Sequence, residues 1–402
     1  MPGPEAFERS LLFASILLAA TAAATAEDRP ALAQQTELPS LPVAVSNNAV
    51  AALKAGRRQY VVSFNGLGEG RSHADTVAST FVYDSRSRSW TEADPVPGGV
   101  GRLASAAAAA DGRLYVFGGY TVAEDGTEVS TPWTHAFDPR KRTFEERSPI
   151  PVPVDDTVAV TFDDRYIYLI SGWHDLGNVN LVQRYDTRND AWVQATPIPG
   201  PAVFGHAGGI VGNTIVYCDG VAVAVHDDQP REFVAVPDCY LGIIDTDDAR
   251  RIDWRSVDYH PGLPRYRMAA AGVAETNGVL FVGGSENPYN YDGTGYDGRP
   301  SEPAAGALLF DIDMQSWRAL EFEGEASMDH RGLVPFAGEW LTREARWTSA
   351  DGRLRSISHS GSSSPRSSSS PSTSCLRSRP GPSHVSCRAT AAFVSRKCAS
   401  AR

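Results

Sequence analysis

The stretch Leu114-Tyr-Val-Phe-Gly-Gly119 decides the fold, because its pattern recurs along the chain. An apolar, β-rich run that ends in small residues returns at Tyr60–Gly66, Ile167–Gly172, Ile215–Gly220 and Val279–Gly284. β-branched and aromatic residues suit buried strands, and a glycine pair lets the backbone turn where a side chain would clash. Self-similarity of this kind predicts a repeat architecture built from short strands.

Each repeat continues with the same two features. After the glycine pair, a polar loop leads to the next strand of the repeat, which ends in an aspartate. An aromatic residue follows six to nine positions later. The aspartates are Asp84, Asp138, Asp186, Asp245 and Asp311, and the aromatic residues are Trp90, Phe144, Trp192, Trp254 and Trp317. The aspartate can bond backbone N–H groups and set a turn. The aromatic ring is long enough to reach the neighbouring repeat.

This order of Gly-Gly, apolar-Asp turn and Trp resembles the kelch repeat, in which about 50 residues form one four-stranded blade. The resemblance implies an all-β, six-bladed kelch-type β-propeller. Five blades can be read in full, and we expect the sixth to be incomplete at its C-terminus. Leu333–Phe336 and Glu339–Thr342 would begin it, and Gln35–Leu38 would supply its outer strand.

The repeat pattern stops after Thr342. Residues 343–402 are rich in Ser, Arg and Pro, and their ten Arg and one Lys against two carboxylates give about +9, which leaves about −20 on the rest of the chain. Such a composition cannot bury a core, so we expect disorder. We interpret the break as a shift of the reading frame, which the coding DNA after Thr342 would test. A native basic tail is the alternative.

The N-terminus has the features of a signal peptide. The apolar run Leu11–Ala24 is short for a membrane span, and Ala24-Thr25-Ala26 offers a cleavage site. An uncleaved apolar helix is the alternative. We therefore expect a signal peptide over 1–26, a linker over 27–35, a propeller over 36–342 and a tail over 343–402. The expected location is periplasmic or secreted, with no membrane span once the signal is removed.

Charge and cysteine content limit the classes of partner and site that this chain can have. The net charge of −11 argues against a nucleic-acid partner, which needs a basic face. An oxidising compartment would permit a bridge between Cys218 and Cys239, but spacing leaves two separate thiols equally open. The chain has no HExxH, G-x-S-x-G or Walker pattern, and no EF-hand pattern. We therefore predict neither a metal nor a cofactor.

Candidate ligand-binding residues gather at the starts of the innermost strands. They are Arg102, Asp156, His206, Arg267, His330 and Arg331. Several arginines at one mouth of the channel would suit an anionic group, because guanidinium binds carboxylate bidentately. Alternatively, these residues hydrogen-bond between blades.

The loops that follow the second strands add a second group of candidates: Trp173, His174, Glu286, Asn287, Tyr289 and Tyr291. Aromatic faces can stack on sugars while amides and carboxylates bond hydroxyl groups. The same Asn-, Asp- and Gly-rich composition also makes ordinary turns.

Over residues 36–342 the chain resembles exported six-bladed kelch proteins that include bacterial N-acetylneuraminate mutarotases. The resemblance rests on Leu38-Pro-Ser-Leu-Pro42, the secretion signal, the blade count and Arg102 followed by Leu114–Gly119. The mutarotase pattern has a catalytic Glu and an Arg where this chain has Val221 and Asp227.

That departure leaves the catalytic residues unknown, with Glu286, His206 and Asp156 as candidates for acid–base work. Galactose-oxidase-type copper enzymes share the kelch scaffold, but they need a Tyr/His/Cys ligand set, and both cysteines of the body lie in blade four.

Three functions are consistent with these observations. The first is a binding propeller for a carbohydrate or another small anionic ligand at one mouth of the channel. The second is a sugar mutarotase or epimerase with a rearranged site. The third is a scaffold for a protein partner. Fold-level resemblance alone does not choose among them.

Overall fold

The computed structural model describes residues 38–227, 230–320, 326–330, 332–336, 339–341, 346–348 and 355–357. In these residues the chain is all-β, as the repeat pattern predicts, and its helical content is two short 3₁₀ turns, η1 (His73–Asp75) and η2 (Ala274–Thr276). None of the helical segments in this part of the chain has the length and apolar character needed to cross a membrane. The expected signal peptide and linker lie outside the described residues.

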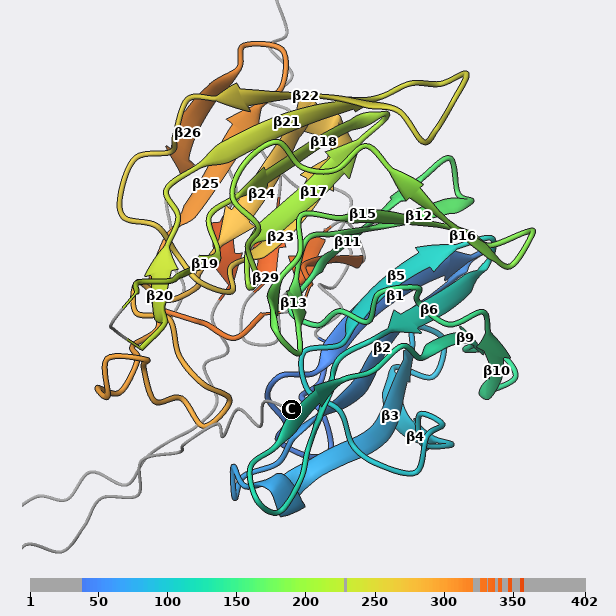
Figure 1. Cartoon of the computed structure of the whole chain (residues 1–402). Coiled ribbons are helices and arrows are strands. Elements are labelled where there is room, and N and C mark those ends of the chain that lie inside the picture. Colours follow the sequence, from blue (N-terminus) through green and yellow to red (C-terminus); the bar gives the residue numbers. More distant parts are fainter. Residues whose placement is uncertain are drawn as a thin grey trace, which may run out of the picture. The chain divides into compact units, whose positions relative to one another are not determined.

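Five antiparallel sheets of four strands follow one another along the chain (Figure 1). Blade one contains β1 (Ala49–Ala55), β2 (Arg58–Leu67), β3 (Thr76–Asp84) and β4 (Ser89–Ala93). Blade two contains β5 (Ala106–Ala110), β6 (Arg113–Phe117), β9 (Thr134–Asp138) and β10 (Thr143–Arg147). Blade three contains β11 (Val158–Phe162), β12 (Tyr166–Ile170), β15 (Val182–Asp186) and β16 (Ala191–Ala195).

Blades four and five repeat the arrangement. Blade four contains β17 (Ala207–Val211), β18 (Thr214–Cys218), β21 (Cys239–Ile244) and β22 (Ile252–Val257). Blade five contains β23 (Ala269–Val273), β24 (Gly278–Val282), β25 (Ala307–Asp311) and β26 (Ser316–Leu320). The first strands β1, β5, β11, β17 and β23 pack side by side in that order (Figure 1). The five predicted blades are therefore confirmed as a β-propeller arrangement.

A smaller sheet of three-residue strands follows blade five: β27 (Val334–Phe336), β28 (Glu339–Leu341), β29 (Arg346–Thr348) and β30 (Arg355–Ile357), paired in that order. β27 contacts β1 and β2 of blade one. β29 and β30 lie beyond Thr342, in the segment for which composition predicts disorder. Residues 358–402 lie outside the described residues. Of the expected outer strand Gln35–Leu38, only Leu38 is described. It is not in a strand, and it packs against Val61, Tyr83 and Val334.

The recurring tryptophans join neighbouring blades, as their position in the repeat predicts. Each indole Nε1 donates to a carbonyl in the segment that precedes its own blade: Trp192 to Ser148 at 2.8 Å, Trp254 to Thr196 at 3.1 Å and Trp317 to Asp258 at 2.7 Å. Trp90 donates in the same way to Pro39 at 2.6 Å. The segment that begins at Leu38 therefore takes the place of an inter-blade connection before blade one.

The aspartates that end the third strands set the following turns, also as predicted. The Oδ1 atom of Asp138 accepts from the backbone N–H of Arg140 at 2.9 Å, and Oδ1 of Asp186 accepts from that of Arg188 at 3.1 Å. The glycine pairs are required for a different reason. At Gly118, with φ +53°, a Cβ atom would lie 2.1 Å from the Val154 carbonyl oxygen. A side chain there would force blades two and three apart.

Candidate functional site

Most of the predicted site residues lie at one end of the blades. Isolated bridges pair Asp155 with Trp173, Phe204 with Val221 and Tyr266 with Ser285. Each bridge joins a residue just before an innermost strand to a residue just after a second strand. The loops of both kinds therefore meet at the same end, which we call the loop end.

Small hairpins extend the loop end beyond the blades. They are β7 (Tyr120–Val122) with β8 (Glu128–Ser130), β13 (Trp173–His174) with β14 (Gly177–Asn178), and β19 (Val221–Ala224) with β20 (Glu232–Ala235). Figure 1 shows β13, β19 and β20 on the same side of the sheets. Blade five has a longer loop instead, residues 283–306, between β24 and β25.

A cavity of about 380 Å³ lies between the innermost strands. Its walls are small residues, among them Ala106–Ala109 and Gly208–Gly209, as the composition of those strands predicts. Its ionisable residues at the loop end are Asp156, His206, Arg267 and His330. The volume is in the range of small-molecule sites, which are mostly apolar with a few convergent polar groups.

Arg267 is buried in an ion-pair network at this end of the cavity. Its Nε and Nη2 atoms donate to the two carboxylate oxygens of Asp156 at 3.2 and 2.6 Å, and Nη1 donates to Asp329 at 3.0 Å. The guanidinium also lies over the rings of Tyr266 and Tyr289, at 4.5 and 5.0 Å. Burial alone would lower the pKa of Arg267, but Asp156 and the other neighbours raise it well above its usual value. Its positive charge is therefore retained and balanced by carboxylates of the protein.

Arg102 does not line the cavity. The side chain has no exposed surface, donates from Nη1 to the Gly118 carbonyl at 2.8 Å and lies 5.1 Å from the Trp133 ring centroid. Burial lowers its pKa to about 10. Arg331 lies outside the described residues. The expected convergence of several arginines on the mouth is thus absent among the described residues, where Arg267 alone reaches the cavity and does so as an inter-blade ion pair.

Among the described residues, His206 is a cavity residue whose ring makes no hydrogen bond of normal geometry. Its side chain is buried, with 6% of the residue exposed, and its ring lies edge-on to Tyr217 at 5.7 Å. The Ile170 backbone lies near the ring, but neither ring nitrogen makes a hydrogen bond of normal geometry to a described residue. Burial lowers the pKa of His206 to about 4, so the imidazole is neutral at pH 7. A neutral imidazole offers one donor and one acceptor.

His330 has a different environment from His206. Its Nε2 atom lies 3.0 Å from the Ser327 hydroxyl, and 5% of the residue is exposed. It therefore lines the cavity with at least one hydrogen bond already made.

The aromatic residues of the blade-five loop pack against other blades. Tyr289 is 2% exposed and its hydroxyl lies 3.4 Å from Asp329. Tyr291 packs on a cluster from blades one and two that includes Leu67 and Tyr120. Tyr296 stacks on Phe233 of β20 with ring centroids 4.1 Å apart. The expectation that Tyr289 offers an open face to a sugar is therefore wrong, because Tyr289 is buried. The blade-five loop lies across the loop end and packs against the other blades there.

The remaining candidates lie outside the cavity lining. Glu286 is exposed, and the Asn287 amide donates to Asp297 at 3.1 Å. Trp173 is half-buried between Phe204 and Phe233, and the His174 Nδ1 atom lies 2.9 Å from the Pro153 carbonyl oxygen. These four residues are not brought together with Asp156 and His206.

The positions that the mutarotase resemblance singles out are also outside the cavity. Val221 is fully buried and pairs with Phe204, while Asp227 is exposed beyond β19. Neither side chain lines the cavity.

Sequence reasoning missed two carboxylates near the cavity. Asp329 bonds Arg267, and its own Oδ2 accepts from the Asn47 backbone at 2.8 Å. Asp155 is 2% exposed and accepts from the Ser130 hydroxyl at 2.6 Å. Burial, followed by the neighbouring Asp156, raises the pKa of Asp155 well above its usual value, which favours the protonated form of its carboxyl group. The sequence could have indicated both residues, because each lies next to a candidate: Asp155 precedes Asp156, and Asp329 precedes His330.

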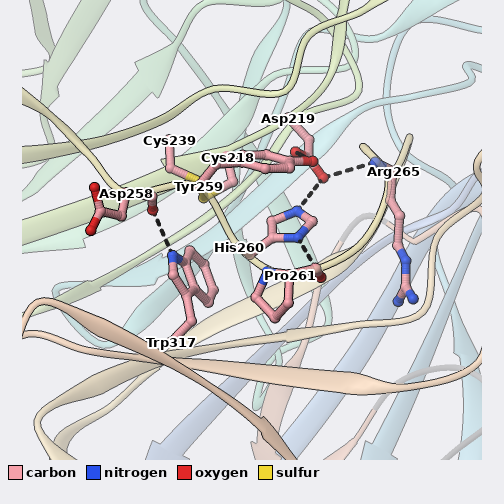
Figure 2. The surroundings of a disulfide bond; sticks show 9 residues. All are labelled: Cys218, Asp219, Cys239, Asp258, Tyr259, His260, Pro261, Arg265 and Trp317. Atoms are coloured by element: carbon pink, nitrogen blue, oxygen red, sulfur yellow. Dashed lines mark hydrogen bonds and ion pairs between the residues drawn. A yellow bond between two sulfur atoms is a disulfide. The ribbon is translucent and has the colours of Figure 1, made fainter.

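A disulfide joins Cys218 at the end of β18 to Cys239 at the start of β21 (Figure 2). The spacing left bridged and separate thiols equally open, and the structure shows the bridge. The adjacent Asp219 is buried and accepts from Tyr259 Oη at 2.8 Å, from His260 Nε2 at 2.9 Å and from the Arg265 backbone at 2.8 Å (Figure 2). The bridge and Asp219 therefore hold the connection between blades four and five. Within the described residues, no group of three His, Cys, Asp or Glu side chains is placed to hold a metal ion.

Comparison with known proteins agrees with this geometry. Residues 101–151 match a family model described as "Kelch motif". Over 119 residues, 30% of this chain and 19% of the relative, the chain is 34% identical to Kelch-like protein 35 of Mus musculus. Over 175 residues, 42% of this chain and 18% of the relative, it is 26% identical to Beta-scruin of Limulus polyphemus. The chain thus spans about a fifth of the length of these curated relatives.

Among solved structures, the one titled "Structure of YjhT" is similar in fold, with a TM-score of 0.61 and 15% identity. The similarity covers 80% of this chain and 99% of that chain. At this identity it bears on the fold alone.

Proposed function

This chain is a kelch-repeat β-propeller, and from that premise we propose that it is an exported binding protein whose channel takes a small, neutral, hydroxyl-rich ligand of the carbohydrate class. The apolar run Leu11–Ala24 and the expected cleavage site after it support the proposed export. We also propose that β27–β30 form an incomplete sixth blade, supported by the contact between β27 and β1.

His206 carries the proposal. A buried polar group without a hydrogen bond costs about 1–3 kcal/mol, which a bound ligand can recover. The neutral ring lines the cavity, and its donor and acceptor match a hydroxyl group, which also has one donor and accepts.

The charge balance favours a neutral ligand over an anion. Arg267 is the cation of the cavity lining, and Asp156 and Asp329 already bond it. An anion entering the cavity would have to displace one of these carboxylates. A polyol needs no such exchange, and its C–H groups can lie against the alanines of the innermost strands.

Calorimetry and thermal shift with a panel of neutral monosaccharides test the proposal, with N-acetylneuraminate as the anionic comparison. We expect at least one neutral sugar to raise the melting temperature, His206→Ala to abolish the shift, and His174→Ala to leave it unchanged, because His174 lies outside the cavity lining. If no sugar binds, or if His206→Ala binds as the parent does, the channel is not the site.

A sugar mutarotase is the second candidate, and the pair Asp155 and Asp156 favours it. The pKa of Asp155 is raised well above its usual value by burial and Asp156, while Asp156 is ion-paired with Arg267, and interconversion of anomers needs an acid and a base. Saturation-transfer NMR of sugar anomers would show faster exchange with the protein than in buffer if this activity is present. An unchanged exchange rate would eliminate it.

A further inference from the structure

The loop end carries a concentration of negative charge that the channel does not use. We define the acidic rim as the loops and hairpins between second and third strands of the five blades. These are residues 68–75, 118–133, 171–181, 221–227, 230–238 and 283–306; the buried residues Asp219 and Gly220, which follow β18, are left out because they face the interior. They contain thirteen Asp and Glu residues against three Arg, and none of the thirteen is buried.

The opposite end of the blades is nearly balanced. Because neighbouring strands are antiparallel, the short turns after first and third strands lie there. They are residues 56–57, 85–88, 111–112, 139–142, 163–165, 187–190, 212–213, 245–251, 274–277 and 312–315. They contain ten Lys and Arg against nine Asp and Glu. The acidic excess of these loops and turns is therefore concentrated at the rim.

The three rim arginines against thirteen carboxylates leave these residues with a net charge of about −10. Arg299 pairs with Asp297 of the same loop. Arg231 lies over the rings of Trp173 and Phe233, at 5.2 and 5.5 Å. Arg71 donates to the backbone carbonyl of Asp292 at 3.5 Å. The carboxylates at the hairpin tips, such as Glu124 and Asp227, are solvent-exposed.

Exposed apolar side chains lie among these carboxylates. Leu176 at the tip of the β13–β14 hairpin is 88% exposed, and Val225 beyond β19 is 79% exposed. Val129 of β8 and Val234 of β20 are 46% and 42% exposed. The hairpins adjoin one another, since β8 contacts β13 and β14 contacts β19. Apolar groups rimmed by charge are typical of interaction surfaces.

We propose that the acidic rim docks a basic polypeptide segment that carries apolar side chains between its cations. Carboxylates on five adjacent loops would attract such a segment over several ångströms and orient it. The exposed Leu176 and Val225 would then bury against its apolar residues. The same field repels nucleic acid and acidic glycans. This inference does not depend on the proposed function, because the rim and the channel use different residues.

The probe is a fluorescein-labelled peptide of four Lys-Leu-Gly repeats, with a Glu-Leu-Gly counterpart as its control. Fluorescence anisotropy on the full chain is measured at about 50 and 300 mM NaCl, where exposed charges are screened to different degrees. We expect the lysine peptide to bind about tenfold more weakly at the higher salt and the glutamate peptide not to bind. Equal binding of the two peptides would overturn the proposal.

A matched pair of charge reversals locates the surface. Glu124→Lys with Asp227→Lys changes the rim, and Asp247→Lys with Glu275→Lys makes the same charge change at the opposite end. All four side chains are exposed and make no side-chain hydrogen bond with another described residue that would be lost. We expect at least a fivefold loss of affinity for the rim variant and less than twofold for the other. Equal losses would mean attraction by net charge alone and would overturn the rim assignment.

Two further variants separate the apolar contribution to peptide binding from any contribution of the channel. Leu176→Ser with Val225→Ser is expected to weaken binding threefold or more at high salt, where apolar contacts dominate. Unchanged affinity would remove the apolar part of the proposal. His206→Ala is expected to leave peptide binding unchanged, so failure at the rim and failure in the channel are distinguishable.

Discussion

Arg267 donates to both carboxylate oxygens of Asp156, from Nε at 3.2 Å and from Nη2 at 2.6 Å, although 111 residues separate them. Both side chains are 3% exposed. The pair links the start of blade five to the start of blade three across the loop end of the channel. Asp329 extends the link toward β27, so one guanidinium holds three parts of the ring. A buried ion pair of this kind specifies geometry more than it adds stability.

Removing the cation from this network should destabilise the protein strongly. Arg267→Met leaves Asp156 and Asp329 buried without their counter-charge, and breaking a buried pair costs about 3–5 kcal/mol. Urea unfolding at pH 7 measures the loss. The triple variant Arg267→Met, Asp156→Asn, Asp329→Asn should recover at least half of it. A single variant that loses under about 1 kcal/mol would show that solvent reaches the carboxylates.

Two buried histidines should make the protein acid-sensitive. Burial lowers the pKa of His206 to about 4, and burial together with Arg102 lowers that of His135 to about 4. Between pH values of about 4 and 6.5 the unfolded chain therefore binds more protons than the folded chain. The free energy of unfolding falls as the pH drops from about 6.5 toward 4. Each imidazole contributes about 2 kcal/mol of loss between pH 7 and pH 5.

The comparison that isolates one histidine uses His135→Phe, which keeps a ring against Phe144. Urea unfolding at pH 7 and pH 5 should show a loss about 2 kcal/mol smaller for this variant than for the parent. Asp155, whose raised pKa acts in the opposite direction, is common to both proteins and cancels. Identical losses would place the His135 pKa near its ordinary value.

The repeat pattern predicted the blades because each blade is specified locally. The turn at Asp138 and the Trp192 contact to Ser148 depend on residues at fixed offsets, so five copies suffice to recognise them. Position at the loop end was predictable for Asp156 and His206 for the same reason. The residues that Asp156 and His206 contact could not be predicted in this way.

What the pattern could not predict depends on contacts without a repeat counterpart. Arg102 precedes the bridge residue Leu103 and lies against Trp133, whereas Arg267 follows the bridge residue Tyr266 and meets Asp156 and Asp329. The packing of the blade-five loop could not be predicted either. Its Asn, Asp, Gly and Tyr content does not indicate that Tyr296 stacks on Phe233.

The disulfide should contribute measurable stability. Cys218 and Cys239 are 21 residues apart, and closing a loop of this length restricts the unfolded chain by about 3 kcal/mol. Dithiothreitol should lower the free energy of unfolding by about that amount in the parent and leave Cys218→Ala with Cys239→Ala unaffected. Peptide mapping by mass spectrometry identifies the linked pair. A parent protein insensitive to reductant, with free thiols at both positions, would contradict the bridge.

The stack of Tyr296 on Phe233 should hold the blade-five loop across the loop end. The rings lie 4.1 Å apart with planes 18° from parallel, and such pairs contribute about 0.5–1.5 kcal/mol beyond burial. Tyr296→Ala should therefore release the loop without unfolding the blades. Hydrogen exchange should speed up at least tenfold for amides within residues 285–306, while the amides of β17 and β24 stay protected. Tyr296→Phe keeps the ring and should exchange as the parent does. If the alanine variant also exchanges as the parent does, Tyr289 and Tyr291 hold the loop without the stack.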